Sequence, residues 1–318
     1  MKAATSERAH RTLLENGWPV VTAIVPTHDR PELLARAIRS VLAQDYPGRI
    51  EILIVFDQRD PQAPDVGEAS DRDLVLSTNE RSPGLAGSRN TGALAASGEL
   101  LAFLDDDDEW LPSKLRLQVE ALRSHPEASL ATCGIYVING QREIVRSPPG
   151  PRVTLDHLTR SRRMEVHSST LVMRRDRLLD DIGLVDEDIP GSYGEDYDLL
   201  LRAAKFAPIV AVPEPLARVH WAGSFFADRW GTIVPALEYQ LAKHPELTRD
   251  PRNLSRMYGR IAFAYAASGD KEKARRWARD SVRLDPRQPR GYLAYAVASG
   301  IVRPAWVIKA VNATGRGV

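Results

Sequence analysis

Residues 20–56 read VVTAIVPTHDRPELLARAIRSVLAQDYPGRIEILIVF, and this stretch decides the fold class. Val20–Pro26 and Ile50–Phe56 are short apolar runs rich in β-branched residues, which is typical of buried strands. Between them, Glu32–Gln44 carries apolar residues at helical spacing, with Pro31 at the expected helix start. A strand–helix–strand unit of this length predicts two parallel strands joined by a crossover helix.

The same alternation continues downstream and predicts one α/β domain over residues 18–225, preceded by a polar N-terminal extension, residues 1–17. Further strands are expected at 73–77, 99–104, 130–139, 142–145, 169–174, 209–212 and 216–219, and further helices at 84–97, 111–124 and 197–206.

The sequence after Ala222 changes character and predicts a helical C-terminal extension over residues 226–318. Helices are expected at 230–243, 251–268, 271–284 and 290–298. Residues 258–286 resemble a tetratricopeptide-like helical hairpin, but one such unit does not make a repeat array, so a small helical cap is the alternative.

Composition limits the partners. The chain has 318 residues and a formal net charge of +1, which argues against a nucleic-acid partner. Residues 251–318 nevertheless hold 14 Lys plus Arg against 4 Asp plus Glu, so this region can either contact anionic lipid or form a solvated helical face.

Compartment and membrane topology follow from two further features. The single cysteine, Cys133, excludes an intrachain disulfide and a cysteine-based zinc site, and it suits a reducing compartment. No apolar stretch reaches 18 residues, so we expect no membrane span. We expect a cytoplasmic protein, at most peripheral at the inner face of the plasma membrane.

Four consecutive aspartates, Asp105–Asp108, directly follow the expected strand 99–104. Ligands of open α/β sheets bind outside the carboxyl ends of the strands. Four adjacent carboxylates repel one another unless a cation is present, and Mg²⁺ or Mn²⁺ prefers oxygen ligands. The alternative is a solvated acidic loop capping the next helix; Trp110 and Pro112 favour a shaped loop instead.

Other polar residues fall at loop positions of the same domain. Asp57 ends the second strand, where it can accept hydrogen bonds from a nucleoside or serve as a turn residue. The small residues of Pro83–Gly92 allow close approach of a ligand to Arg89, or tight helix–sheet packing. Glu195 and Asp196 precede a helix, where they can act as a general base or as helix-capping carboxylates.

Four segments in this order resemble the family 2 inverting glycosyltransferases of the GT-A fold. The segments are VTAIVPTHDRPELLARAIRSVLAQDYP, IEILIVFDQRD, NERSPGLAGSRNTGALAASGELLAFLDDDDEWLPSKL and GEDYDLLLRAA, and together they cover about residues 18–222. The resemblance implies an α/β, GT-A type, Rossmann-like fold: a mixed, mostly parallel sheet with flanking helices, here with a C-terminal all-α extension.

The resemblance also implies roles for individual residues. Asp105, Asp106 and Asp107 fall on the family's Asp-x-Asp motif, with Asp107 the preferred ligand of Mn²⁺ or Mg²⁺, although the run of four leaves the register uncertain by one residue. Asp196 falls on the catalytic base, with Glu195 beside it. The remaining implied roles are nucleotide-sugar binding by Pro26, Thr27, Asp29, Asp57 and Arg89, contact with metal or diphosphate by His220, and an acceptor region around His167, Ser169 and Tyr193.

The implied reaction is metal-assisted transfer of a sugar from a nucleotide-sugar donor to a hydroxyl of a glycan or lipid-linked acceptor, by a single displacement. UDP-sugars are the favoured donors, although dTDP- and GDP-sugars also occur among relatives, and a homodimer is compatible with the family. One departure affects the nucleoside contacts: the family's second strand usually ends in two aspartates, and Phe56 replaces the first of them here.

Two other functions compete with this interpretation. A nucleotidyltransferase would use a similar sheet but needs a basic glycine-rich loop after the first strand, where this chain has Thr27–Arg30. A non-catalytic sugar-nucleotide-binding or scaffold protein is the second alternative, although the presence of both Asp107 and Asp196 argues against it. Both histidines, His167 and His220, can also be structural.

Overall fold

The computed structural model describes residues 17–67, 73–161, 165–220 and 229–312, so almost all of the expected N-terminal extension lies outside the described residues. The chain divides into two compact units. The sheet unit comprises residues 1–155, 165–187 and 199–222, and the helical unit comprises residues 156–164, 188–198 and 223–318. The division is therefore not one cut in the chain, because residues 188–198 belong with the C-terminal helices.

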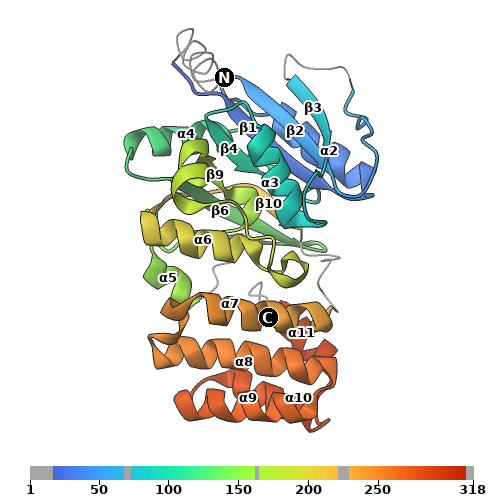
Figure 1. Ribbon diagram of the computed structural model, residues 1–318, viewed down its shortest axis with the longest axis vertical. Helices are drawn as coiled ribbons and strands as arrows, with labels where there is room; N and C mark the ends of the chain where they lie inside the picture. The colour runs from blue at the N-terminus through green and yellow to red at the C-terminus, as the bar shows by residue number, and fades with distance from the viewer. Residues whose placement is uncertain (1–16, 68–72, 162–164, 221–228, 313–318) are drawn as a thin grey trace. The chain divides into compact units, whose positions relative to one another are not determined.

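A single mixed sheet forms the centre of the sheet unit, with the strand order β3-β2-β1-β4-β9-β6-β10-β5 (Figure 1). Strands β1 to β4 are parallel to one another, β9 runs antiparallel to β4 and β6, and β10 is parallel to β6. The expected mixed sheet with flanking helices is confirmed. Its strands are β1 (Val21–Thr27), β2 (Ile50–Phe56), β3 (Asp73–Thr78), β4 (Leu100–Phe103), β5 (Glu109–Trp110), β6 (Leu130–Asn139), β7 (Arg142–Arg146), β8 (Arg152–Val153), β9 (Val172–Arg174) and β10 (Ile209–His220).

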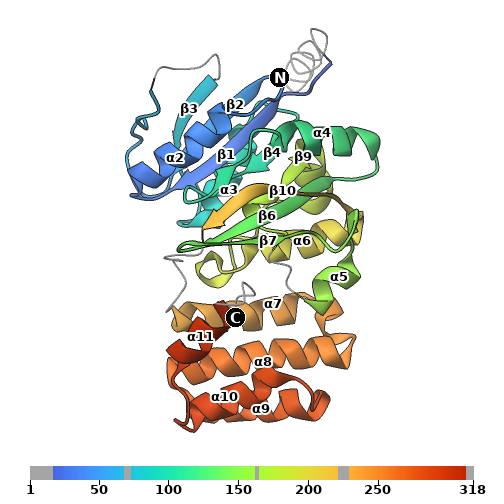
Figure 2. The ribbon, with the colours of Figure 1, turned by 180° about the vertical axis from the view of Figure 1, so that it is seen from behind.

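Helices cover both faces of this sheet. Helix α2 (Pro31–Leu42) and helix α4 (Lys114–Ser124) bury apolar side chains in one cluster with Ala23 and Val25 of β1. Successive strand residues face opposite sides, so Ile24 points to the other face, against helix α3 (Leu85–Ala95). Figures 1 and 2, which view the chain from opposite sides, show α3 in front in the first and α2 in front in the second.

Gly92 explains how α3 approaches the sheet so closely. A Cβ atom at this position would lie 2.5 Å from Cγ2 of Ile24, closer than carbon atoms can pack. The small residues of the predicted segment 83–92 therefore serve helix–sheet packing in part, and they place Arg89 on the buried face of α3.

Three elements differ from the sequence expectation. Helix α4 begins at Lys114 rather than 111, because Glu109 and Trp110 first pair with β10 as the short strand β5. The expected strand 169–174 is divided into a 3-10 turn, η1 (Ser168–Thr170), and β9. The two strands expected at 209–212 and 216–219 are one strand, β10, with register shifts around Pro215, because proline cannot donate a ladder hydrogen bond.

The helical unit contains an antiparallel hairpin of helix α8 (Pro251–Ser268) and helix α9 (Lys271–Leu284). Gly269 adopts the left-handed conformation (φ 92°) that ends α8, and Asp270 caps α9 by accepting from the Lys273 N–H at 3.0 Å. The described helical elements here are α7 (Trp230–Lys243), η4 (Pro245–Thr248), α8 (Pro251–Ser268), α9 (Lys271–Leu284), α10 (Pro289–Ala298) and α11 (Pro304–Asn312). Three short elements lie earlier in the chain: α5 (Leu155–Arg160), the π-turn η2 (Arg177–Ile182) and η3 (Pro190–Ser192).

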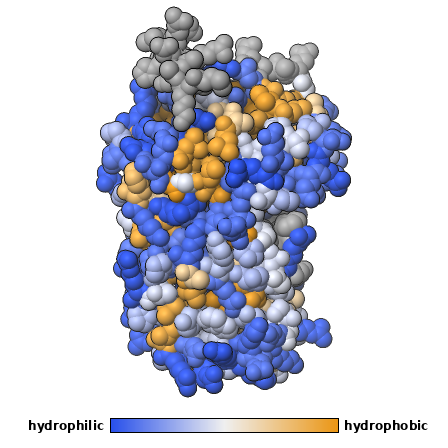
Figure 3. Space-filling model, viewed as in Figure 1, coloured by the Kyte–Doolittle hydropathy of each residue, from blue (hydrophilic) through white to orange (hydrophobic). Residues whose placement is uncertain are grey.

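The edge strand β3 and the single cysteine differ in their exposure to solvent. The edge strand β3 leaves Leu74 and Val75 partly exposed, and hydrophobic side chains are visible at its position in Figure 3. The single cysteine, Cys133, is fully buried on β6, and burial raises the pKa of its thiol to about 11. None of the described helices has the length and apolarity that a membrane span requires.

Candidate active site

The loops after β1, β2 and β4 meet at one edge of the sheet, because these parallel strands pair in register. Thr27 ends β1 and donates its hydroxyl to Oδ2 of Asp106 at 2.7 Å. Asp57 follows β2, and Asp105 follows β4 after one intervening leucine. The sequence expectation that these acids share an edge agrees with the register of the strands.

Asp105 is fixed by partners from two separate segments. The buried Arg89 of α3 forms an ion pair with its Oδ1, and Ser168 donates to its Oδ2 at 2.7 Å. Burial alone would raise the pKa of Asp105, but Arg89, His167 and the Ser168 hydrogen bond hold it below its usual range. Asp105 is therefore a carboxylate, oriented by its neighbours.

Asp108 has neutral partners instead. Ser169 donates its hydroxyl to Oδ2 at 2.6 Å, and the His220 N–H donates to Oδ1 at 3.0 Å. Burial, together with the negative charges of Asp107 and Asp105, raises the pKa of Asp108 well above its usual range. A cation placed beside Asp108 would remove this penalty.

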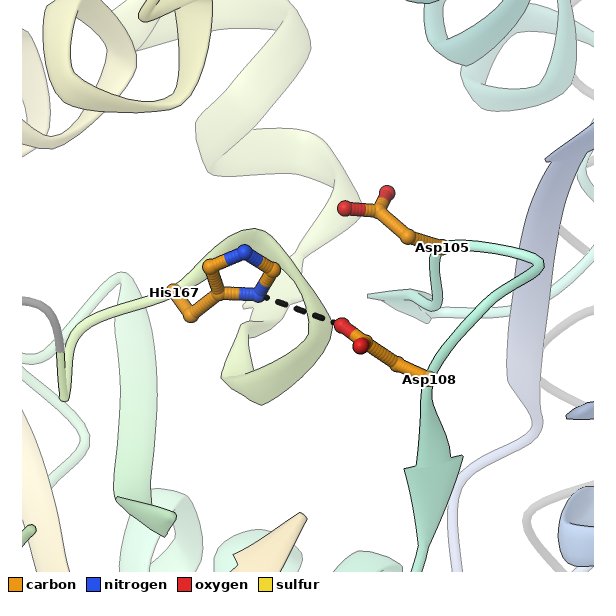
Figure 4. Close-up of side chains that lie close together, drawn as sticks. All are labelled: Asp105, Asp108 and His167. Atoms are coloured by element: carbon orange, nitrogen blue, oxygen red, sulfur yellow. Dashed lines mark ion pairs between the residues drawn. The ribbon is translucent and has the colours of Figure 1, made fainter. Parts of the chain in front are cut away.

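Among the residues that the structure describes, Asp105, Asp108 and His167 form a group that could hold a cation, because each offers one atom within 4.8 Å of the others (Figure 4). Nδ1 of His167 lies 3.4 Å from Oδ2 of Asp108. Two carboxylate oxygens and an imidazole nitrogen are a donor set that a divalent first-row metal accepts. The side chains therefore fit the divalent cation that the sequence implied.

Asp107, the ligand preferred from the sequence, lies outside this set. Arg30 bridges the neighbouring acids: it pairs with Asp106 and donates to Oδ2 of Asp107 at 2.9 Å. Burial raises the pKa of Asp106 to about 6 even though Arg30 and Thr27 oppose the shift. The Arg30 guanidinium thus occupies the place of a counter-ion for these two acids.

His220 is also separate from the Asp105–Asp108–His167 group. Its Nε2 lies 3.0 Å from Oε1 of Glu109, and only its backbone N–H touches Asp108. Asp105, Asp108 and His167 lie together in this geometry, whereas the predicted metal residues Asp107 and His220 each lie against another partner.

Ser169 lies beside Asp108. Its side chain is fully buried, with the hydroxyl on Asp108, and its carbonyl accepts the indole N–H of Trp110 at 2.7 Å. The hydroxyl of Ser169 therefore orients Asp108. His167, which the sequence also placed in the acceptor region, lies in the group that could hold a cation.

Asp57 organises the loop before α3. Asn79 donates to its Oδ1 at 2.8 Å and the Gly84 N–H donates to its Oδ2 at 3.0 Å. The preceding loop is equally constrained: His28 donates from Nδ1 to the Asp57 carbonyl at 2.7 Å, and Asp29 has a positive φ of 55°. Pro26, within β1, pairs in register with Val55.

The predicted general base lies in the helical unit. Glu195 and Asp196 form the first turn of helix α6 (Glu195–Phe206), and both are largely buried. Gln240 of α7 donates to the carbonyls of Tyr193 and Gly194 at 3.0 Å, which fixes the segment that leads into this turn.

A buried charge network lies in the same turn. Asp198, fully buried, lies 2.8 Å from Nε2 of His244 and 2.7 Å from Nζ of Lys243. Nδ1 of His244 lies 3.0 Å from Oε1 of Glu246. The start of α6 is therefore held by paired charges within the helical unit.

The sequence did not single out Arg30 and Ser168 as site residues, and it left open which of the aspartates Asp105–Asp108 bind a metal. Arg30 precedes a helix start, where it resembled a boundary residue, and Ser168 stands beside the histidine that was noticed. The position of Asp108 as fourth acid in a run of four carried the signal, but only the fold shows which members of the run converge.

The chain is similar in sequence to known proteins. The sequence profile described as "Glycosyl transferase family 2" matches residues 22–183, just over half of the chain. The Escherichia coli enzyme UDP-Glc:alpha-D-GlcNAc-diphosphoundecaprenol beta-1,3-glucosyltransferase WfgD is 31% identical over 194 residues, which cover 61% of this chain and 73% of that protein.

Two solved structures share the fold. Staphylococcus aureus TarS 1-349 in complex with UDP superposes with a TM-score of 0.59 at 19% identity, covering 87% of each chain. Mannosyltransferase PcManGT from Pyrobaculum calidifontis, in complex with GDP-Man and Mn²⁺, gives 0.51 at 17% identity over 94% of this chain and 95% of that one.

The mixed sheet and its similarity to these two structures define a GT-A-like fold. The matched profile then places the chain in one family: it belongs to glycosyltransferase family 2, as its sequence motifs predicted.

Proposed function

We propose that this glycosyltransferase moves a sugar from a nucleoside-diphosphate donor to a glycan hydroxyl and inverts the anomeric configuration. The observation that carries the proposal is the convergence of Asp105, Asp108 and His167 within 4.8 Å. The group lies at the sheet edge beside the loops that follow β1 and β2, where α/β sheets bind nucleotides.

Asp105, Asp108 and His167 would bind Mn²⁺ or Mg²⁺, which when bound offsets the negative charge of the donor diphosphate. Ligands of one ion about 2.1 Å away lie at most roughly 4.2 Å apart, so side chains that lie within 4.8 Å would need to move by only about 0.6 Å to bind one ion. Asp107 stays a competing ligand, because its carboxylate is partly exposed and its partner Arg30 can turn toward a phosphate.

Other residues of the sheet edge would position the donor. Each oxygen of Asp57 already accepts a hydrogen bond, and its remaining lone pairs support the proposed contact with the nucleoside. Arg89 is committed to Asp105, so its part is to orient that carboxylate. Arg30 is the more exposed guanidinium, and it is our choice for the diphosphate contact.

Asp196 would accept the proton of the acceptor hydroxyl while the hydroxyl oxygen attacks the anomeric carbon. The new carbon–oxygen bond forms on the face opposite the leaving nucleoside diphosphate, whose bond breaks, so a single displacement inverts the configuration. Glu195 is the adjacent acid. The rigid setting of this turn, with Gln240 on one side and His244 on the other, supports a positioned base.

The similarity to WfgD supports a UDP-sugar as donor and a diphosphate-lipid-linked glycan as acceptor. The basic C-terminal helices, with 14 Lys plus Arg against 4 Asp plus Glu after residue 250, support peripheral contact with an anionic membrane. Sedimentation with anionic and with neutral vesicles tests the membrane contact. Analytical ultracentrifugation tests the homodimer that the family resemblance allows.

The decisive experiment measures donor binding and hydrolysis across UDP-, dTDP- and GDP-sugars, with and without Mn²⁺ or Mg²⁺. The variants are Asp108→Asn, Asp107→Asn and Asp196→Asn. We expect metal-dependent binding of one nucleotide class that Asp108→Asn removes and Asp196→Asn retains. Binding without any turnover, even with lipid-linked acceptors, would favour the non-catalytic alternative, and no binding at all would refute the proposal.

A further inference from the structure

Three arginines that have no role assigned above gather in the helical unit. Arg256 and Arg260 lie one turn apart on α8 and are 8% and 7% exposed. Arg290 is the second residue of α10, and its Cβ lies against Gly259, where an added Cβ would come within 2.7 Å. The absence of a side chain at Gly259 therefore allows α10 to bring Arg290 up to α8, beside the other two.

These three guanidinium groups, the arginine cluster, lack a balancing negative charge. No ion pair joins any of them to a carboxylate in the part of the chain that the structure describes. Hydrogen bonding by Arg256 is also incomplete, since its buried Nε has no acceptor. The side chain of Arg260 reaches only the Met257 sulfur at 4.0 Å, and a thioether is a weak acceptor.

Burial of unpaired like charges is costly, and the local electrostatics show it. Burial and the positive charges of Arg260 and Arg290 lower the pKa of Arg256 to about 10, although Tyr197 opposes the shift. Burial and Arg260 lower the pKa of Arg290 as well. A folded protein keeps such a cluster at lower cost when an anion neutralises it.

We infer that Arg256, Arg260 and Arg290 form a binding site for a phosphate-bearing anion, with diphosphate the best match. Guanidinium groups bind phosphate oxygens through paired N–H donors, and the N-terminus of α10 adds a favourable dipole at Arg290. Arg290 is only half-buried, so the cluster is accessible from solvent.

The location indicates a source for the anion. Arg256 donates to the Thr159 carbonyl at 2.9 Å and to the hydroxyl of Tyr197, the residue next to the proposed base Asp196. The diphosphate of a lipid-linked acceptor is therefore the source we favour, and this part rests on the proposed function. Free pyrophosphate shares the same chemistry and is the competing source.

The first experiment measures pyrophosphate binding to the full-length chain by calorimetry and thermal shift, in EDTA to suppress metal-dependent binding at the sheet edge. Binding should weaken at least about tenfold in the double variant Arg260→Gln/Arg290→Gln. Arg283→Gln on α9, 71% exposed, is the control and should bind like the wild type.

Equal binding by the double variant and the wild type would overturn the arginine site. The single variant Arg290→Gln guards against misfolding, because Arg290 is half-buried and its removal relieves repulsion; its unliganded melting temperature should not fall. A large fall in that temperature, with pyrophosphate affinity unchanged, would make the cluster structural and also overturn the inference.

The second experiment separates the two sources. Farnesyl diphosphate and pyrophosphate are compared on the wild type and the double variant, and tighter cluster-dependent binding of farnesyl diphosphate supports the acceptor source. Equal affinities support a site for the free anion. Donor hydrolysis by water is measured in parallel, since its survival in the double variant separates failure of this site from failure of the proposed transferase.

Discussion

The acidic cluster after β4 and the first turn of α6 both concentrate carboxylates, but their partners differ. Asp108 accepts hydrogen bonds from two neutral donors, Ser169 and the His220 N–H, and among the described residues no lysine or arginine pairs with it. Asp198 is buried as deeply but lies against the ammonium group of Lys243. A buried carboxylate without a permanently charged partner is suited to binding a cation, whereas one paired with a lysine is suited to holding the fold.

The largest effect that this comparison predicts comes from Asp108→Asn. Loss of the unbalanced charge should reduce metal-dependent donor turnover by about a hundredfold to a thousandfold, with little change in stability. Steady-state kinetics with Mn²⁺ titration measures it. Asp107→Asn is the matched control and should lose less of this turnover. A larger loss in Asp107→Asn than in Asp108→Asn would make Asp107 the metal ligand.

His244→Ala should act on stability instead. The substitution leaves Asp198 and Glu246 buried with a partner missing, so we expect a loss of about 3 kcal/mol in the free energy of unfolding. Urea denaturation measures it. Lys243→Ala should cost less because Lys243 is 29% exposed. If His244→Ala is as stable as the wild type, the charges around Asp198 do not hold the fold, and the contrast with the acidic cluster after β4 fails.

Ser169→Ala should have an intermediate effect, confined to the affinity for the metal. Removal of the hydroxyl that orients Asp108 should weaken Mn²⁺ affinity by about tenfold, because groups that hold metal ligands typically contribute this much. Metal titration by calorimetry tests the effect. Thr248→Ala, whose hydroxyl only donates to a carbonyl in the helical unit, should leave the affinity as it is.

The smallest effect concerns pH. Burial alone would raise the pKa of Glu187, but hydrogen bonds from Asn90, Arg81 and Ser82 lower it to about 2, from an ordinary value of 4.5. A lowered folded-state pKa means that these contacts stabilise the protein above pH 4.5 and are lost as the pH falls toward 2. Melting temperatures from pH 6 to pH 3 should therefore fall less steeply in Glu187→Gln; parallel curves would contradict this.

The sequence predicted the parts of the fold that depend on local pattern. The apolar runs of β1 and β2 and the helical spacing of α2 were sufficient for the parallel unit, and the position of the four aspartates after β4 placed them at the sheet edge. The family motifs then identified the GT-A fold.

What could not be predicted depends on contacts between distant segments. Ser169 reaches Asp108 across 61 residues, so no local pattern distinguishes Asp108 from Asp107. The arginines of α8 resembled a solvated basic face, yet Arg256 and Arg260 are buried because α8 is packed on several sides. Residues 188–198 join the helical unit through tertiary packing that sequence periodicity does not encode.

Cys133 gives the sheet a built-in chemical reporter. As the only thiol of the chain, fully buried on β6 and with a raised pKa, it should not react with an aromatic disulfide reagent while the strand is intact. Modification then requires the strand to open, so the labelling rate measures how often the sheet opens. Donor or metal bound at the sheet edge should slow the labelling, and this readout needs neither a known acceptor nor an introduced probe.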